Sequence, residues 1–329
     1  MRWLLYLSLL FSFIVTFIST AYLIRYLRKI DLVVKDVHKI DTPLIPVSGG
    51  LAVLGGVMAG LMWYIFVQTF YYESPENLIL LFSAITTILL ITFIGFIDDL
   101  VIEKKKDETS GLKQWQKPLL TLFAAVPLMV VKAGTSVMLI PFLGRVDIGL
   151  IYPLLFVPLG IVGASNMVNM LAGFNGSEIG MGVVYLGMLG LYAYTNQRYS
   201  AAAIAGITVL ALLAFYYYNR VPAKILGGDS LTYLLGGVLV TVAVLGNIER
   251  AALIASIPFF IEFILKLRGK FKKKSIGTYE NGKIRSLYGN KIYSIPHLLT
   301  RTGKYTEKQV VYFMIFIQLI FSSLIWFIK

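Results

Sequence analysis

The stretch Asn166-Met-Val-Asn-Met-Leu-Ala-Gly-Phe-Asn-Gly-Ser-Glu178 separates two long apolar segments and contains no basic residue. It predicts a helix end followed by a glycine turn, because Gly173 and Gly176 permit a tight reversal and Asn175 tolerates left-handed backbone angles. Asn169 lies three residues after the first asparagine, so both share one helix face. Capping and turn formation explain any one of these residues. Crowding of the whole group at a membrane boundary favours a functional site, because unpartnered polar groups are costly there.

The composition limits the class of protein. Of the 329 residues, 57% are hydrophobic and only 14% are charged, which is too apolar for a soluble domain. Cysteine is absent, which excludes disulfides and thiolate metal sites, and two histidines leave little for a histidine metal centre or a Ser-His triad. A net charge of +13 can indicate nucleic-acid binding. In a membrane protein, however, Lys and Arg first set orientation and contact anionic lipid or phosphorylated substrates, so no nucleic-acid partner is expected.

About ten apolar segments satisfy the criterion of roughly 20 residues for a membrane span. They run near Trp3–Ile24, Ile45–Phe70, Leu78–Ile97, Leu119–Val131, Leu150–Val168, Ile179–Tyr194, Ala201–Tyr218, Leu231–Leu245, Ala251–Leu265 and Val310–Ile328. We therefore expect an all-α polytopic membrane protein with a single domain over residues 1–329. The first segment lacks a small-residue cleavage signature and is expected to be a retained helix rather than a signal peptide.

The distribution of basic residues predicts the topology. With the N-terminus outside, the odd-numbered loops are cytoplasmic and hold 24 of the 30 Lys and Arg residues. The positive-inside rule then places both termini outside. The ninth loop contains Asn281-Gly282 between two short runs, which predicts a small β-hairpin over the cytoplasmic face. The charge run from Lys266 to Lys274 suits a lipid-facing anchor as well as a substrate contact.

Three carboxylates fall on the same cytoplasmic side as the asparagine stretch. Asp98 and Asp99 end the third apolar segment, where the negative end of the helix dipole disfavours them, so a purely structural role is poorly supported. They are suited to hold Mg²⁺ or to accept a proton. Asp229 precedes the eighth segment, where an ordinary N-cap is an equally good explanation. Oxygen ligands alone suit Mg²⁺ or Mn²⁺ rather than zinc or copper, and a basic rim favours phosphate or pyrophosphate chemistry.

Four motifs, in this order along the chain, resemble those of the polyprenyl-phosphate N-acetylhexosamine-1-phosphate transferases. They are Lys35-Asp-Val-His-Lys39 with Pro46-Val-Ser-Gly-Gly50, Gly95-Phe-Ile-Asp-Asp99 with Lys117-Pro118, the stretch from Asn166 to Glu178, and Gly228-Asp-Ser230. The resemblance covers essentially the whole chain. The Leu-Ala-Gly-x-Asn-Gly form of the third motif looks like the eukaryotic and archaeal GlcNAc-1-phosphate transferases. The compact ninth loop fits an archaeal enzyme.

The resemblance implies a role for individual residues. Asn169 and Asp229 would be the ligands of Mg²⁺ (or Mn²⁺), and Asp98 and Asp99 would be the catalytic pair. Lys117 would meet phosphate. The substrate-binding candidates as a set are Lys35, Asp36, Ser48, Lys117, Asn166, Gly173, Asn175, Gly176, His297 and Arg301. The last two stand, with a neighbouring lysine, in place of the Arg-His-Arg cluster of the eukaryotic enzymes.

The reaction implied is transfer of GlcNAc-1-phosphate from UDP-GlcNAc to dolichyl (polyprenyl) phosphate with release of UMP. It is the first step of lipid-linked oligosaccharide synthesis for N-glycosylation. Asn175 would contact the uracil end of the donor, and Asp98 or Asp99 would orient or deprotonate the acceptor phosphate. A multi-pass cell-membrane enzyme with a cytoplasmic active site is expected, and a homodimer is compatible with the family. The alternatives are another UDP-sugar, such as UDP-GalNAc or a muramyl nucleotide, and an ion-coupled transporter, which normally places its ion sites near mid-membrane.

Overall fold

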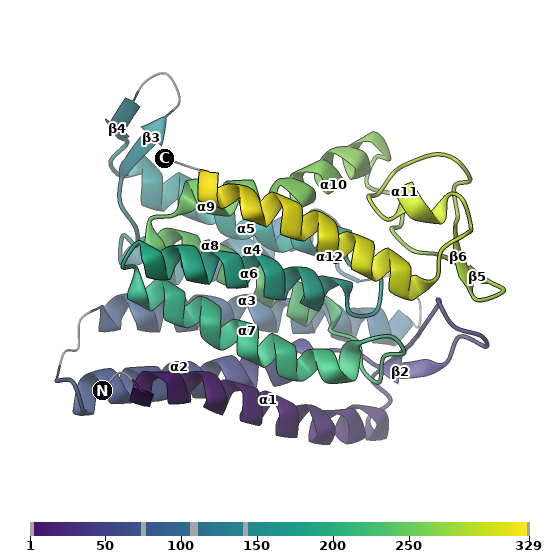
Figure 1. Cartoon of the computed structure of the whole chain (residues 1–329), viewed down its shortest axis with the longest axis horizontal. Helices are drawn as coiled ribbons and strands as arrows, with labels where there is room; N and C mark the ends of the chain where they lie inside the picture. The colour runs from purple at the N-terminus through teal and green to yellow at the C-terminus, as the bar shows by residue number, and fades with distance from the viewer. Residues whose placement is uncertain (1–2, 74–76, 106–110, 141–143, 328–329) are drawn as a thin grey trace.

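The structure, a computed structural model, describes residues 3–73, 77–105, 111–140 and 144–327. Its long helices lie side by side in one bundle (Figure 1). These are α1 (Trp3–Lys29), α2 (Gly50–Phe70), α3 (Leu78–Lys105), α4 (Gln116–Val130), α5 (Val157–Leu171), α6 (Ser177–Thr195), α7 (Tyr199–Asn219), α8 (Gly228–Gly246) and α12 (Glu307–Ser323). The short helical elements are η1 (Tyr152–Phe156), α9 (Glu249–Ala255), α10 (Ile257–Arg268), α11 (His297–Thr300) and η2 (Leu324–Phe327). Arg2, Lys106 and Lys329, which enter the charge count above, lie outside the described residues.

Seven of the described helices are long and apolar enough to cross a membrane, in keeping with a polytopic membrane protein. The other three predicted spans correspond to α4, which is shorter, to α6, and to the pair α9 and α10. The ninth apolar segment is therefore not one continuous helix. It breaks at Ser256, because Pro258 in the first turn of α10 has no N–H with which to continue the ladder of α9. The number of ten spans stays a prediction.

Helix α3 runs further than the apolar pattern suggested. It continues to Lys105, so Asp98 and Asp99 lie about two turns before its end. The expectation that these aspartates end the helix is wrong, and the unfavourable interaction with the helix dipole does not apply to them. Loss of apolar character marked the membrane boundary, whereas the polar residues that follow stay helical.

Three short antiparallel strand pairs accompany the helices, so "all-α" needs correction. Strands β5 (Gly277–Glu280) and β6 (Lys283–Ser286) flank Asn281-Gly282, where the sequence predicts a hairpin. Two further pairs were not expected: β1 (Val33–Lys35) with β2 (Leu44–Pro46), and β3 (Val137–Ile140) with β4 (Gly144–Asp147). Strand β2 is also bound on its far side, because Leu226 donates its N–H to the carbonyl of Pro46 at 2.8 Å.

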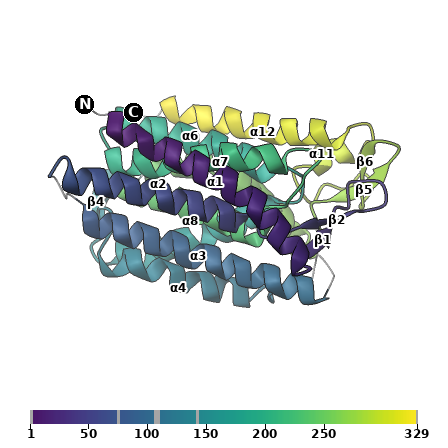
Figure 2. The same cartoon turned by 90° about the horizontal axis from the view of Figure 1, so that it is seen from below.

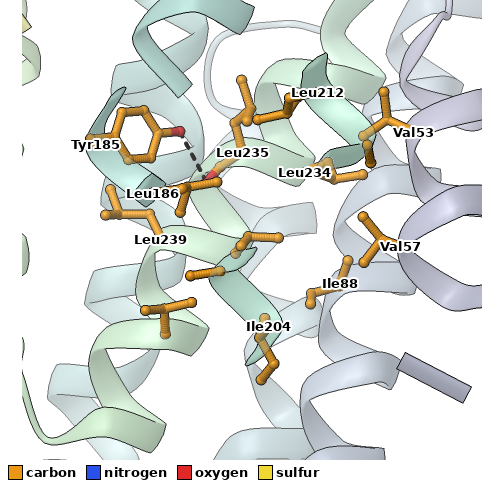
Figure 3. Packing of buried hydrophobic residues seen from close by; sticks show 14 of the residues in the cluster. Val53, Val57, Ile88, Tyr185, Leu186, Ile204, Leu212, Leu234, Leu235 and Leu239 are labelled. Atoms are coloured by element: carbon orange, nitrogen blue, oxygen red, sulfur yellow. Dashed lines mark hydrogen bonds between the residues drawn. The ribbon is translucent and has the colours of Figure 1, made fainter. Parts of the chain in front are cut away.

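Helix α8 lies at the centre of the core. Its Leu234, Leu235 and Leu239 pack among Val53 and Val57 of α2, Ile88 of α3, Tyr185 and Leu186 of α6, and Ile204 and Leu212 of α7 (Figure 3). Small residues bring the neighbours close. A Cβ on Gly236 would lie 2.4 Å from the Cα of Ser165 in α5, and one on Gly95 of α3 would lie 2.4 Å from the carbonyl oxygen of Asp229. Positions along α8 are therefore fixed by backbone contact with α3 and α5.

The two ends of the bundle differ. The start of α1 and the end of the last helix lie together at one end, and β1, β2, β5, β6 and α11 lie at the other (Figures 1 and 2). Helices α1, α3, α5 and α7 end at this second end, and α4, α6, α8 and α12 begin there. All four sequence motifs therefore lie at one end of the bundle, which we call the motif end.

The contact between α3 and α8 can be tested at Gly95. We expect Gly95→Ala to lower the free energy of unfolding by about 1–3 kcal/mol, because the added methyl group meets backbone atoms that cannot yield. The matched control is Gly55→Ala in α2, whose Cβ would meet nothing within 4 Å. Thermal unfolding of the purified proteins in detergent measures both. Equal midpoints for the two variants would contradict the close approach.

Candidate active site

Asp98 and Asp99 follow each other on α3, and both are fully buried at the motif end. They have different partners. One oxygen of Asp98 lies 2.6 Å from the ammonium of Lys117, and the other accepts the N–H of Leu112 at 2.6 Å. Asp98 therefore joins α3 to the segment that enters α4. An ion pair on one oxygen and a hydrogen bond on the other offset part of the cost of burying this group.

Asp99 binds the start of α8 instead. Its two oxygens accept the backbone N–H groups of Asp229 at 2.7 Å and Ser230 at 3.2 Å. These donors belong to the first turn, which has no partners within its own helix. Gly228 permits the approach: its φ is +73°, and a Cβ there would lie 2.5 Å from the Asp99 carboxylate. The capping interaction expected of Asp229 is thus made by Asp99, and the Asp229 side chain is left for another use.

Lys117 bridges two of the three carboxylates. Its ammonium lies 2.6 Å from Asp98 and 3.1 Å from Asp229. Burial alone would lower the pKa of Lys117, but the charges of Asp229 and Asp98 outweigh it and hold that pKa above its ordinary value. Lys117 is therefore charged at neutral pH. Among the described residues it is the cation that forms ion pairs with Asp98 and Asp229, whereas Asp99 binds backbone N–H groups instead.

Asp229 and Asn169 provide the open oxygen atoms of the group. Both residues line the same two hollows, and the Asp229 side chain is only partly buried. Asn169 lies in the last turn of α5, while Asp229 lies in the first turn of α8. A carboxylate and a carboxamide oxygen that line the same hollow can hold a hard divalent cation such as Mg²⁺. The residues present therefore fit such an ion.

Two hollows meet at this pair. The first, which we call the inner cavity, has a volume of about 340 Å³ and lies beneath the loops of the motif end. The second, the outer groove, has a volume of about 1160 Å³ and lies between α4, α5 and α10. The residues that line both are Asn169, Met170, Asp229, Lys266 and Lys274. Two ligands, one in each hollow, would therefore meet at the side-chain oxygens of Asn169 and Asp229, which we call the oxygen pair.

A second charged cluster closes the inner cavity on the side away from α8. The side-chain amide of Asn175 donates to Asp36 at 2.8 Å, and its backbone N–H donates to Glu307 at 3.2 Å. The ammonium of Lys39 forms ion pairs with both acids. His38 lies 3.5 Å from Glu307 and stacks on Phe174. Asp36, His38 and Glu307 have the spacing of a metal site, but Lys39 already provides the balancing cation.

Apart from His297 and Arg301, the predicted site residues fall into three groups. Those lining the inner cavity are Lys35, Asp36, Asp99, Asn169, Gly173, Asn175 and Asp229. Those lining the outer groove are Lys117, Asn166, Asn169 and Asp229. Asp98, Ser48 and Gly176 support the site from behind: Ser48 is buried next to Asp99, and Gly176, with φ +88°, precedes α6.

His297 and Arg301 line neither hollow. His297 is buried, and its Nδ1 accepts the N–H of Tyr293 at 3.2 Å. Burial first, and then the charge of Lys266, lowers the pKa of His297 to about 4, so the ring is neutral at pH 7. Arg301 is exposed at the end of α11. The roles of His297 and Arg301 in substrate binding stay predictions.

Three polar residues that the structure brings to the site were not among the predicted site residues, and a fourth, Glu178, belonged to the third motif but had no predicted role. Lys266 and Lys274 line both hollows, Glu307 binds the backbone of Asn175, and Glu178 accepts the N–H of Gly173 at 2.8 Å. The two lysines belong to the charge run that also suited a lipid anchor, so the signal was present but not specific. Glu307 is 132 residues from its partner, and no local pattern indicates that contact.

Comparison with known proteins gives consistent results. Residues 81–247 match the family described as glycosyl transferase family 4. A protein of Saccharolobus solfataricus, named "Putative UDP-N-acetylglucosamine--dolichyl-phosphate N-acetylglucosaminephosphotransferase", is 34% identical over 318 residues, which are 96% of this chain and 94% of that one. The UDP-N-acetylglucosamine--dolichyl-phosphate N-acetylglucosaminephosphotransferase of Dictyostelium discoideum is 27% identical over 88% of this chain and 78% of its own. The phospho-N-acetylmuramoyl-pentapeptide-transferase of Lactiplantibacillus plantarum is 32% identical over 78% of this chain and 79% of its own.

The capping role of Asp99 makes a prediction about stability. In Asp99→Asn the new NH₂ group would face one of two backbone donors, so we expect a loss of about 1–3 kcal/mol of unfolding free energy. The control is Asp147→Asn in β4, where an exposed carboxylate accepts a single N–H, that of Gly149, at 2.9 Å. Thermal midpoints compare the two. An Asp99→Asn variant as stable as the control would show that α8 does not depend on this cap.

Proposed function

The chain belongs to glycosyl transferase family 4, and we propose that it transfers GlcNAc-1-phosphate from UDP-GlcNAc to a dolichyl (polyprenyl) phosphate. The products would be GlcNAc-PP-lipid and UMP. The observation that carries this proposal is the meeting of two different hollows at Asn169 and Asp229. The inner cavity suits a compact polar ligand, and the outer groove suits an apolar chain with a charged head group.

The inner cavity has the chemistry for a nucleotide sugar. Asp36 and Asn175 offer hydrogen-bonding groups at one side, and Lys35 and Lys274 add cations for phosphate. The side of the cavity next to α8 carries Asp229. A donor lying across the cavity would therefore have its diphosphate near the oxygen pair and its base near the second charged cluster.

The outer groove has the chemistry for a polyprenyl phosphate. Trp115, Phe260 and Phe263 give it apolar walls, and Lys117 and Lys273 give it cations. A smaller apolar cavity of about 280 Å³ continues along α5 and shares with the groove the residues Gly163, Met167 and Phe260. The isoprenoid chain would follow this path along α5 while its phosphate stays beside Lys117.

The proposed reaction is a single displacement. An oxygen of the acceptor phosphate attacks the β-phosphorus of the donor and forms the new P–O–P bridge. The bond from that phosphorus to the bridging oxygen breaks, and UMP leaves with the electron pair. The acceptor needs no strong base, because a phosphate monoester with a second pKa near 6 is largely a dianion at pH 7.

Asn169 and the three aspartates of the site would then have the following tasks. Asn169 and Asp229 would hold Mg²⁺ (or Mn²⁺), which when bound supplies electrostatic stabilisation of charge on the leaving phosphate. Asp98 would hold Lys117 towards the acceptor phosphate, and Asp99 would fix the backbone of Asp229. This geometry favours positioning over proton abstraction for both members of the Asp98–Asp99 pair.

The membrane placement is proposed from the charge asymmetry. The motif end carries the loops rich in Lys and Arg, so it would face the cytoplasm, with both termini outside. UDP-sugars are polar and would reach the inner cavity from that side. The acceptor would enter the outer groove sideways from the bilayer of the cell membrane.

Two rival functions have different support. Transfer of another N-acetylhexosamine, or of a muramyl peptide, is favoured by the similarity to the phospho-N-acetylmuramoyl-pentapeptide-transferase. An ion-coupled transporter is disfavoured, because the described carboxylates of the site gather at one end of the bundle rather than near its middle.

The proposal is tested by UMP release. Purified protein with Mg²⁺, UDP-GlcNAc and a polyprenyl phosphate should release UMP and form a lipid-linked GlcNAc diphosphate, both measurable by mass spectrometry. Release with UDP-GalNAc or a muramyl nucleotide alone would replace the sugar assignment. No release with any of these donors, with Mg²⁺ or Mn²⁺, would refute transferase activity.

The metal assignment is tested separately. We expect Asp229→Asn and Asn169→Ala each to lower the rate of UMP release by at least about 100-fold, as loss of a group that stabilises transition-state charge does. A titration with Mg²⁺ should reach half-saturation at a higher concentration in both variants. Asp147→Asn, at the opposite end of the bundle, serves as the matched control. Wild-type rates at wild-type Mg²⁺ concentrations would remove these two residues from the metal site.

A further inference from the structure

Helix α10 is apolar except for one acid, Glu262, and two bases, Lys266 and Arg268. Glu262 and Lys266 are four residues apart and so lie on one face, with exposed fractions of 0% and 6%. Their charged atoms are 3.5 Å apart. A buried ion pair gives little net stability unless further hydrogen bonds satisfy both partners. The hydrogen bonds that Glu262 and Lys266 make to other residues therefore indicate the role of the pair.

Glu262 binds the later part of the ninth loop. One carboxylate oxygen accepts the hydroxyl of Ser294 at 2.6 Å, and the other accepts the backbone N–H of Ile295 at 2.8 Å. These two residues precede α11, and all the atoms concerned are buried. Glu262 therefore attaches the second half of the loop to α10.

Lys266 binds the earlier part of the same loop. Its ammonium donates to the carbonyl of Lys273 at 2.8 Å and to the hydroxyl of Ser275 at 2.7 Å. That hydroxyl in turn donates to the carbonyl of Met170 at 3.1 Å. Met170 directly follows Asn169, the proposed metal ligand. One chain of hydrogen bonds thus joins α10, the basic run and the end of α5.

The place of this network matters as much as its contacts. Lys266 and Lys274 both line the inner cavity and the outer groove, next to Asn169 and Asp229. The backbone on either side of Lys274 is held, because Lys266 binds the carbonyl of Lys273 and the hydroxyl of Ser275. Lys274 also donates its N–H to the hydroxyl of Tyr288 at 2.9 Å. The direction in which Lys274 enters the junction therefore depends on Lys266.

We propose that Glu262 and Lys266 form a positioning pair that holds the basic run of the ninth loop against the end of α5, so that Lys274 faces the diphosphate of a bound nucleotide sugar. The pair does not itself need to touch the donor. This inference rests on the proposed function for its substrate, but the restraint on the loop is a property of the protein alone. The two parts can be tested apart.

The kinetic test uses Lys266→Met, Glu262→Gln and the double variant in the full-length protein. We expect each single variant to raise the KM for UDP-GlcNAc by more than tenfold with a smaller change in kcat. The double variant should regain thermal stability, because neither charge is left unpaired, but keep the high KM. Lys266→Arg should restore part of the lost affinity. Recovery of both stability and KM in the double variant would overturn the positioning role.

A matched control separates loss of position from general loss of stability. Gln318 in α12 is also fully buried, and its amide donates to the carbonyl of Ala255 and to Ser322, both at 2.8 Å. It lines none of the hollows described here. Gln318→Leu should lower the thermal midpoint and leave the KM unchanged. A raised KM in this variant would mean that KM simply follows stability, which would also overturn the proposal.

Limited trypsin digestion tests the restraint without any substrate. The run Lys272-Lys273-Lys274 offers cleavage sites whose backbone is held in the wild type, so cleavage there requires local opening. Cleavage should be several-fold faster in Lys266→Met and Glu262→Gln than in the wild type or Gln318→Leu. Equal rates would refute the pair as a restraint. If the wild-type protein releases no UMP but the cleavage rates differ as expected, the proposed function fails and the restraint stands.

Discussion

The bond between the Asp99 carboxylate and the first turn of α8 is the interaction on which the site depends. A buried carboxylate needs donors, and the start of a helix has backbone N–H groups without partners, so each satisfies the other. Asp229 is one residue of that turn, and its side chain is therefore fixed relative to α3. The glycines at Gly95 and Gly228 allow this approach, because a side chain at either would occupy the space of the bond or of the backbone behind it. The same contacts with α3 fix the position of α8 along its own axis, and α8 lies at the centre of the core.

Lysines balance the buried acids of the motif end in three places. Lys117 pairs with Asp98 and Asp229, Lys39 with Asp36 and Glu307, and Lys266 with Glu262. The pairs at Lys117 link α3, α4 and α8, and those at Lys39 link the β1–β2 loop to α12. The pair at Lys266 lies within α10. The first place differs from the others. There a third carboxylate, that of Asp99, binds backbone N–H groups, and the Asp229 carboxylate lines two hollows, which leaves room for a further cation.

The sequence indicated which polar residues come together at the motif end better than it indicated the structure around them. Asn169, Asp229, Asp98 and Lys117 could be predicted, because oxygen ligands and a cation in ordered motifs on one side of a membrane suggest their chemistry. The end of α3 was wrong, since apolar character reports the membrane boundary and not the last helical residue. Strands β1 and β2 were missed because each has three residues, and β2 also depends on a bond to Leu226, far along the chain. Glu307 could not be predicted as a site residue, because its partner Asn175 is 132 residues away in the sequence. Glu262 could not be predicted either, because it pairs with Lys266, whose charge run also suited a lipid anchor.

The break in the ninth apolar segment explains how one end of the bundle can offer both a polar cavity and an apolar groove. Because α10 starts anew after Ser256, it can run obliquely past the other helices towards the motif end (Figure 1). Neighbouring residues of a helix face different ways, so Phe263 lines the outer groove while Glu262 points into the buried network. One short helix thus forms a wall of the outer groove and the support of the basic run. The two hollows meet where α10 ends, so the proposed water-soluble donor and lipid acceptor would share the oxygen atoms of Asn169 and Asp229.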